Sequence, residues 1–168
     1  MNAGTHLGET QSRLSKVTAL SLSDQVEEIV YGPEALRFEY RKNHFLPENA
    51  VVWSTEWRID RQDPVQVKRV IDETLARRKQ TQPIDYPSCG SVFKNPKEAG
   101  RSAWQVLDEL GLRGHQIGAA QIAEKHSNFI INHGGAKAAD VKALIDLAKT
   151  RARNELGISL QEEVIYVG

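Results

Sequence analysis

The sequence is poor in several features that would define its class. Its 168 residues contain one cysteine, Cys89, which excludes an internal disulfide and a cysteine-rich zinc site. Lysine and arginine number 22, and aspartate and glutamate also number 22, so no global field favours nucleic acid or an anionic membrane. There is no apolar run of about 18 residues to span a bilayer and no signal peptide. These absences predict a cytoplasmic protein that binds neither nucleic acid nor membrane.

The first half of the chain carries strand and helix patterns. Hydrophobic residues make up 40% of the sequence, enough for the core of one medium domain or two small ones. Short apolar runs at 17–22 and 28–31 predict a pair of strands. Residues 51–59 alternate between apolar and polar, which predicts a half-buried strand. Asp63 and Pro64 then favour the start of a helix, and apolar spacing of three and four residues extends it to about residue 79.

The second half predicts two helices and two strands. Prolines and glycines between residues 80 and 100 exclude continuous regular structure and make this stretch the best domain boundary. A helix from about residue 103 ends at Gly111, and a long helix over 141–156 ends at Gly157. Apolar strands are expected at 128–132 and near 158–167. The fold class is α+β: a mixed sheet with one helix, then a compact domain with two helices on a small sheet.

The segment 89–96 is the best candidate for chemistry. Gly90 frees the backbone beside the Ser91 hydroxyl, and Asn95 precedes the rigid Pro96, so such a turn can fix Ser91 Oγ in a cleft. Spacing alone favours a structural turn, because Gly-Ser and Asn-Pro pairs are common in loops. Ser91 lacks the Gly-x-Ser-x-Gly surroundings of a hydrolytic nucleophile, so a proton donor is its better role.

Other candidate residues have plain structural interpretations. His115, His126 and His133 lack the spacing of a helical metal pair, so no metal is expected. The basic residues at 77–79 suit the C-terminal end of a helix dipole rather than a phosphate or nucleic-acid site. Two adjacent glutamates at 162–163 favour a solvated strand edge when taken alone.

Seven segments taken together resemble one family. They are Asn2-Ala3-Gly4, Phe38-Glu39-Tyr40-Arg41, Gly90-Ser91-Val92-Phe93-Lys94-Asn95-Pro96, Gly111-Leu112-Arg113-Gly114, Ile117-Gly118-Ala119-Ala120-Gln121, Glu124 to Asn132, and Leu160-Gln161-Glu162-Glu163-Val164. In order and spacing they are similar to the flavin-dependent UDP-N-acetylenolpyruvoylglucosamine reductases of peptidoglycan synthesis. The resemblance implies that residues 1–83 are the C-terminal part of an FAD-binding domain and that residues 84–168 are a substrate-binding domain.

The resemblance also implies a reaction and its residues. With FAD and NADPH, UDP-N-acetylglucosamine enolpyruvate would be reduced to UDP-N-acetylmuramate. Ser91 would protonate the carbon next to the one that receives hydride, while Arg41 and Glu163 flank the substrate carboxylate on which negative charge builds. The remaining implied residues are Asn95, His126 and Tyr40 for substrate binding and Asn2, Ala3 and Gly4 for cofactor binding.

An alternative follows from what the resemblance leaves out. Family members carry a further N-terminal region that holds the phosphates of FAD, so the chain is also compatible with a non-catalytic fragment that binds UDP-sugar without FAD. Apolar surface is then expected where the other half would pack, with either that half or self-association covering it. Asn43 and Gln161 depart from the family pattern, which has Ser and Glu there, whereas Arg41, Ser91 and Glu163 keep it.

Overall fold

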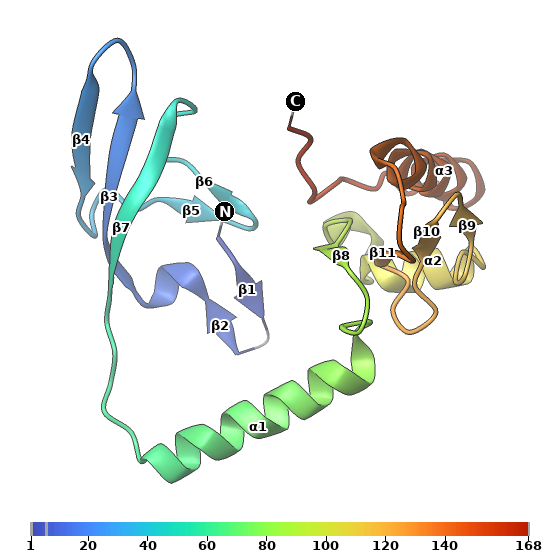
Figure 1. Cartoon of the computed structure of the whole chain (residues 1–168), viewed down its shortest axis with the longest axis horizontal. Helices are drawn as coiled ribbons and strands as arrows, with labels where there is room; N and C mark the ends of the chain where they lie inside the picture. The colour runs from blue at the N-terminus through green and yellow to red at the C-terminus, as the bar shows by residue number, and fades with distance from the viewer. Residues whose placement is uncertain (1, 6, 168) are drawn as a thin grey trace. The chain divides into compact units, whose positions relative to one another are not determined.

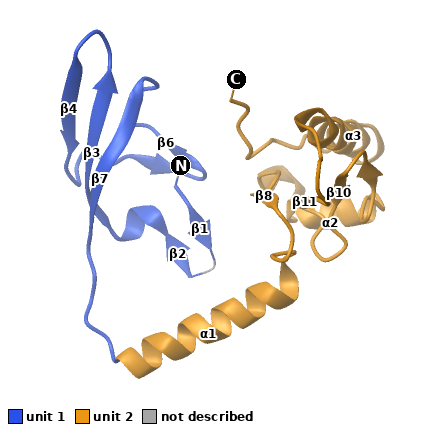
Figure 2. Ribbon diagram, in the orientation of Figure 1, with its two compact units in different colours: residues 1–63 blue, residues 64–168 orange. Residues whose placement is uncertain are grey.

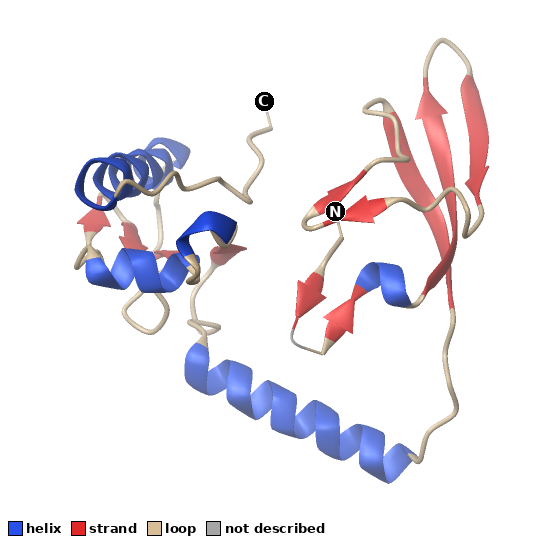
Figure 3. Ribbon diagram, turned by 180° about the vertical axis from the view of Figure 1, so that it is seen from behind, coloured by secondary structure: helices blue, strands red, loops and turns tan. Residues whose placement is uncertain are grey.

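The computed structural model describes residues 2–5 and 7–167, and the chain divides into two compact units (Figure 2). The first unit comprises residues 1–63 and the second comprises residues 64–168. Strands dominate the first unit, whereas helices and strands share the second (Figure 3), so the predicted α+β class is confirmed. The unit boundary precedes the first α-helix. The assignment of 1–83 and 84–168 to a cofactor and a substrate domain stays a prediction.

A three-stranded antiparallel sheet forms the main part of the first unit (Figure 1). Its order is β4-β3-β7, with β3 at Leu14–Leu22, β4 at Val26–Tyr31 and β7 at Ala50–Trp57. The remaining elements are two small hairpins and a 3-10 turn: β1 (Gly4–Thr5), β2 (Gly8–Glu9), η1 (Thr10–Ser12), β5 (Phe38–Glu39) and β6 (Lys42–Asn43). The three predicted strands are confirmed, and their described pairings are antiparallel where a mixed sheet was expected.

Burial in the first unit is concentrated in its central strand. Leu14, Val17 and Ala19 of β3 are buried. Strand β7 contradicts the predicted half-buried pattern, because its residues after Ala50 are all exposed and Trp53 is 70% exposed. Strand β7 lies at an edge of the sheet. The alternating sequence shows which of its side chains suit a core, but burial also requires a second layer of the protein to pack over them. The apolar face of this strand is therefore open to solvent.

Helix α1 (Pro64–Thr81) starts at the predicted proline and contains no buried residue over its fully described length. Lys68 and Asp72 form an i,i+4 ion pair at 2.9 Å, and Arg69 and Glu73 form another at 3.7 Å. Such exposed pairs contribute only about 0.2–0.5 kcal/mol each to a helix. Its apolar stripe, at Val67, Val70, Ile71 and Leu75, is likewise exposed.

A four-stranded antiparallel sheet and two helices make up most of the second unit (Figure 1). The sheet order is β8-β11-β10-β9. The elements are β8 (Ser88–Ser91), η2 (Lys97–Ala99), α2 (Ala103–Glu109), β9 (Gln116–Ile117), β10 (Ala120–Ile122), β11 (Phe129–Asn132) and α3 (Ala138–Leu156). Both predicted helices and the strand near 128–132 are confirmed. Their terminating glycines, Gly111 and Gly157, have φ of +63° and +70°, as a left-handed helix end requires.

The core of the second unit lies between these helices and the sheet. Ala103, Val106 and Leu107 on α2 are buried, as are Leu144, Ile145, Ala148 and Ala152 on α3. Full burial of a large aliphatic side chain contributes about 1.5–3 kcal/mol, so this cluster stabilises the frame that carries the β8 segment. No described helix has the length and apolar character needed to cross a membrane.

The predicted strand near 158–167 is wrong. The described part of this segment makes only an isolated bridge, between Glu162 and Phe93, and then continues with exposed side chains such as Val167, which is 95% exposed. Two backbone bonds flank this bridge, from the Glu163 amide to the Val92 carbonyl and from the Lys94 amide to the Gln161 carbonyl, and the segment does not extend into a regular strand. Pairing therefore ends after a few residues.

Candidate functional site

Ser91 is the last residue of β8 and follows a local irregularity in that strand. Ser91 pairs with Phe129 and Ser88 pairs with Ile131, so β8 advances three residues while β11 advances two. The extra residue forms a β-bulge, and Gly90 within it has a φ of +75° that L side chains rarely adopt. A bulge re-aims the side chain that follows it. The exposed Ser91 thus sits where the strand direction changes, as its glycine neighbour suggested.

Glu163 is joined to the residue that follows Ser91. The Glu163 amide donates a hydrogen bond to the Val92 carbonyl oxygen at 2.7 Å, and the Lys94 amide donates to the Gln161 carbonyl at 2.8 Å. Two residues 72 positions apart in sequence, Ser91 and Glu163, are thereby held within one residue of each other across the pairing. The adjacent Glu162 forms an ion pair with Lys149 at 2.6 Å, and this hydrogen bond lowers the pKa of the Glu162 carboxyl.

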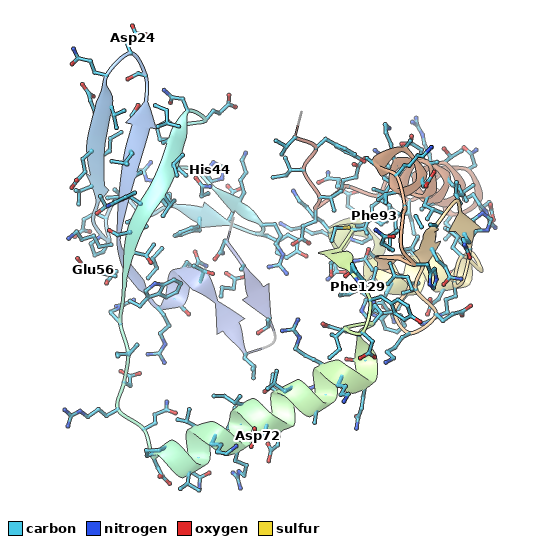
Figure 4. The ribbon with its side chains drawn as sticks, viewed as in Figure 1. Asp24, His44, Glu56, Asp72, Phe93 and Phe129 are labelled. Carbon is cyan, nitrogen blue, oxygen red and sulfur yellow. The ribbon has the colours of Figure 1, made fainter. Side chains whose placement is uncertain are left out.

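Asn128 is a functional-site candidate that the sequence reasoning missed. It is only 4% exposed, and its side chain bonds the Phe93 backbone twice: Phe93 N donates to Oδ1 and Nδ2 donates to Phe93 O, both at 2.9 Å. Phe93 and Phe129, labelled in Figure 4, mark the two segments that it connects. A polar residue at the start of an otherwise apolar strand was the available signal.

Asn95 supports the start of helix α2. Its Oδ1 accepts a hydrogen bond from the Ala103 amide at 3.0 Å, one of the first helical N–H groups, which have no partner within the helix. At the same helix end, the Ser102 amide donates to Gln105 Oε1 at 2.9 Å. The structure therefore gives Asn95 a defined structural contact, while its predicted contact with substrate stays a prediction.

His126 is half-buried near the same segment. Its Nδ1 accepts a hydrogen bond from the Asn128 amide at 3.3 Å, and its ring packs edge-on against Phe129 at 4.9 Å between centroids. Burial is the main cause that lowers the pKa of His126 below its ordinary value of 6.5. The imidazole is therefore favoured in its neutral form, which can still accept or donate one hydrogen bond.

In the first unit, Arg41 is held by the Asn2–Gly4 segment. Its Nη1 donates to the Asn2 carbonyl at 3.3 Å and its Nη2 donates to the Gly4 carbonyl at 3.0 Å. The guanidinium carbon lies 5.0 Å from the centre of the Tyr40 ring, a cation–π geometry. Arg41 has a φ of +58°, the single left-handed backbone among the described non-glycine residues. Such local strain is maintained only when surrounding contacts specify it.

Polar groups of the Asn2–Gly4 segment, predicted to bind the cofactor, form hydrogen bonds with neighbouring residues of the chain. Asn2 is 1% exposed, with Nδ2 donating to Glu9 at 2.9 Å and Oδ1 accepting from the Gln11 amide at 3.2 Å. The Ala3 carbonyl accepts from the Thr10 amide at 2.8 Å. A Cβ on Gly4 would come within 2.9 Å of Glu9 Cγ, which explains the glycine.

The predicted residues thus form two groups. Arg41, Tyr40 and the Asn2–Gly4 segment meet in the first unit, although the sequence separates them by more than thirty positions. The other predicted residues, which lie in the second unit, are Ser91, Asn95, His126 and Glu163. Each group combines segments that the resemblance had marked separately.

Comparison with known proteins decides the family. Residues 82–167 match the family described as UDP-N-acetylenolpyruvoylglucosamine reductase, C-terminal domain. The chain belongs to this family. The UDP-N-acetylenolpyruvoylglucosamine reductase of Heliobacterium modesticaldum is 39% identical over 168 residues, which is 100% of this chain and 52% of that protein. The reductase of Geobacter metallireducens is 38% identical over 100% of this chain and 54% of its own length.

A solved structure extends the family match to the fold. The crystal structure of UDP-N-acetylenolpyruvylglucosamine reductase from Thermus caldophilus matches with a TM-score of 0.79 and 35% identity. It covers 95% of this chain and 56% of that protein. The predicted resemblance to the reductase family is therefore confirmed, and the chain spans about half the length of the relatives it matches.

Proposed function

We propose that this member of the reductase family provides the substrate-side part of an enzyme that reduces UDP-N-acetylenolpyruvoylglucosamine to UDP-N-acetylmuramate in cytoplasmic peptidoglycan synthesis. The observation that carries the proposal is the hydrogen bond between the Glu163 amide and the Val92 carbonyl. It brings two predicted catalytic positions, Ser91 and Glu163, together in a chain of this family. NADPH and FAD would supply the hydride.

The roles proposed for this chain concern charge and a proton. When hydride adds beta to the substrate carboxylate, negative charge collects on that carboxylate and on the carbon beside it. Arg41 would stabilise the charge as a permanent cation, and Glu163 would polarise the carboxylate or share a proton with it. Ser91 would donate its hydroxyl proton to the basic carbon, which a weak acid can do only at hydrogen-bond distance. Asn95, His126 and Tyr40 are proposed to contact the substrate.

The Asn2–Gly4 segment does not fit a cradle for the phosphates of FAD. The Asn2 and Gly4 carbonyls accept from the Arg41 guanidinium, the Ala3 carbonyl accepts from the Thr10 amide, and the Asn2 side chain bonds Glu9 and Gln11. The resemblance assigns the cofactor's phosphates to the part of the family's enzymes that this chain does not match, and we keep a contact of Asn2, Ala3 and Gly4 with another part of the cofactor as a proposal.

The partner in this proposal is a polypeptide equivalent to that unmatched part. Cross-strand pairs place Val30 beside Thr18, Val26 beside Leu22 and Val51 beside Leu20, so these apolar side chains share one sheet face. Val26, Val30 and Val51 are all exposed. Glu28 lies on the same face, opposite Leu20, so the exposed apolar side chains flank a charged residue, and we propose this face as the interaction site. Self-association through the same face is the competing outcome.

A non-catalytic fragment that binds UDP-sugar without FAD is the second candidate. The engaged polar groups of the Asn2–Gly4 segment favour it, because they leave the chain without an evident cofactor cradle there. The two candidates differ in one property: whether flavin-dependent turnover occurs when the chain and a partner are combined.

The test is an absorbance experiment. The full chain is mixed with excess FAD, with and without the N-terminal part of the Heliobacterium modesticaldum reductase, and free cofactor is removed. At least in the mixture that contains both polypeptides, NADPH should bleach the absorbance of the retained flavin. The enolpyruvyl substrate should then restore that absorbance. Ser91→Ala should leave the bleaching step intact and suppress turnover.

Absence of turnover in both mixtures, with UDP-sugar binding retained, would support the fragment instead. Absence of both turnover and binding would overturn both candidates.

A further inference from the structure

Each backbone polar group of the two residues after Ser91 has a partner. Val92 N donates to the Asn128 carbonyl at 2.9 Å, and Val92 O accepts from the Glu163 amide at 2.7 Å. Phe93 N donates to Asn128 Oδ1 and Phe93 O accepts from Asn128 Nδ2, both at 2.9 Å. Asn128 therefore supplies three of these four bonds, two of them from its side chain.

We call the hydrogen bonds from Asn128 to Val92 and Phe93 the Asn128 clamp. Its position matters because Ser91 lies directly before the two residues that it holds. Gly90 lies on the other side of Ser91 with a φ of +75°, and a glycine holds the backbone less firmly than any other residue. Asn128 is 4% exposed, so losing one of its bonds leaves a buried peptide group without a partner. The direction of Ser91 is thus set by its own pairing with Phe129 and by the bonded Val92–Phe93 segment that follows it.

We propose that Asn128 is a positioning residue, whose side-chain amide fixes the Val92–Phe93 backbone and thereby holds Ser91 beside Glu163. This inference rests on the proposed reductase function for its catalytic meaning. Asn128 acts through Ser91 and Glu163 and has no part of its own in the chemistry.

The isosteric variant Asn128→Asp gives this proposal a distinctive signature. A protonated carboxylic acid has one acceptor and one donor, as an amide does, whereas a carboxylate only accepts. Burial raises the pKa of a carboxyl group, so the protonated form should persist above the ordinary Asp value. The clamp should therefore be intact in this variant at low pH and lose its bond to Phe93 O as the pH rises. His126 bonds the Asn128 amide and Glu162 pairs with Phe93, so the wild-type chain is measured at each pH to account for changes in their charge.

The first test measures amide hydrogen exchange in the full chain. In Asn128→Asp at neutral pH, the Phe93 and Glu163 amides should exchange about tenfold or more faster than in the wild type, and acidification should remove the difference. The amides of α3 should keep their relative protection. Ser127→Ala is the matched control, because Ser127 is buried and its hydroxyl donates to the Trp104 carbonyl at 2.8 Å rather than to Phe93.

Equal Phe93 exchange in Asn128→Asp and wild type at neutral pH would overturn the proposal. So would equal acceleration in Ser127→Ala, or a loss of protection that spreads uniformly through the second unit. Asn128→Gln keeps the carbonyl oxygen and the NH₂ group of the side-chain amide on a longer side chain. It should retain part of the protection from hydrogen exchange that Asn128→Asp loses.

The second test uses the turnover mixture described above. Asn128→Asp should lower kcat by about tenfold at neutral pH with KM changed by less than about twofold, and the deficit should shrink on acidification. An unchanged kcat would overturn the positioning role. An inactive wild type would overturn the proposed function, and the exchange comparison would still decide whether the clamp exists.

Discussion

Replacement of Asn95 by alanine tests whether this residue serves helix α2. The Asn95 Oδ1 is the acceptor for the Ala103 amide at 3.0 Å, and alanine would remove it while leaving the Ser102–Gln105 pair in place. Loss of a helix-capping acceptor costs about 0.5–2 kcal/mol. For a unit of roughly a hundred residues, each kcal/mol lowers Tm by about 4–8 °C, so Asn95→Ala should melt about 2–16 °C below wild type.

The assay is thermal unfolding followed by circular dichroism, with Asn95→Asp as the matched variant. Aspartate keeps the acceptor and places negative charge near a helix N-terminus, so it should retain the wild-type Tm within about 3 °C. An unchanged Tm in Asn95→Ala, or an equal loss in both variants, would refute the capping role. Titration of both variants with the enolpyruvyl substrate then tests the proposed substrate contact separately. Because Asn95→Asp keeps the helix cap, a loss of its affinity for substrate would indicate a role of Asn95 in binding.

Three further predictions concern pH, backbone and surface. Burial lowers the pKa of His126 from 6.5, so below pH 6.5 the folded chain binds fewer protons than the unfolded chain does. The free energy of unfolding, measured with urea, should therefore be highest above about pH 6.5 and fall as the pH is lowered. His126→Leu should flatten this part of the pH profile. Gly90→Ala, at a φ of +75° in open space, should cost about 1 kcal/mol from backbone strain alone, and an unchanged Tm would contradict the bulge geometry. In sedimentation velocity the chain should self-associate as its concentration rises, and Val30→Lys should reduce this more than Glu27→Lys on the other sheet face; equal effects would exclude the Val30 face.

Much of the fold follows from sequence patterns. The two helices of the second unit were predicted correctly, and both contribute to one buried cluster with the sheet of that unit, with Leu107 and Leu144 almost fully buried. The glycines that end these helices gave reliable boundaries, since a left-handed residue there has a direct steric cause. Strands β9 and β10 were missed, because they hold only two and three residues and give no measurable alternation.

Burial in the first half could not be predicted in the same way. The alternation in β7 gave the right element and the wrong exposure, because a pattern records which side chains suit a core and is silent on whether a second layer covers them. The final strand failed for a different reason: its apolar residues suit a strand, but a strand also needs a paired neighbour, and this segment pairs only around the Glu162–Phe93 bridge.

The candidate site was predictable in part. The glycine beside Ser91 indicated its turn, and the resemblance paired it with Glu163, which hydrogen bonding in the second unit supports. The Asn128 clamp was missed because its bonds to Phe93 join residues 35 positions apart, and a single polar residue before an apolar strand does not indicate which segment it bonds.

The most direct measurement of the central claim is a calorimetric titration of the full chain with UDP-N-acetylglucosamine enolpyruvate, beside a titration with UDP-N-acetylglucosamine, which lacks the carboxylate. Charge-assisted bonds to that carboxylate should make the first ligand bind about tenfold or more tightly. Glu163→Gln should alter this preference while leaving the affinity for the second ligand unchanged. Saturable binding with this preference is the predicted result. No binding of either ligand, or equal affinity for both, would contradict the assignment of this chain to the substrate side of the reductase.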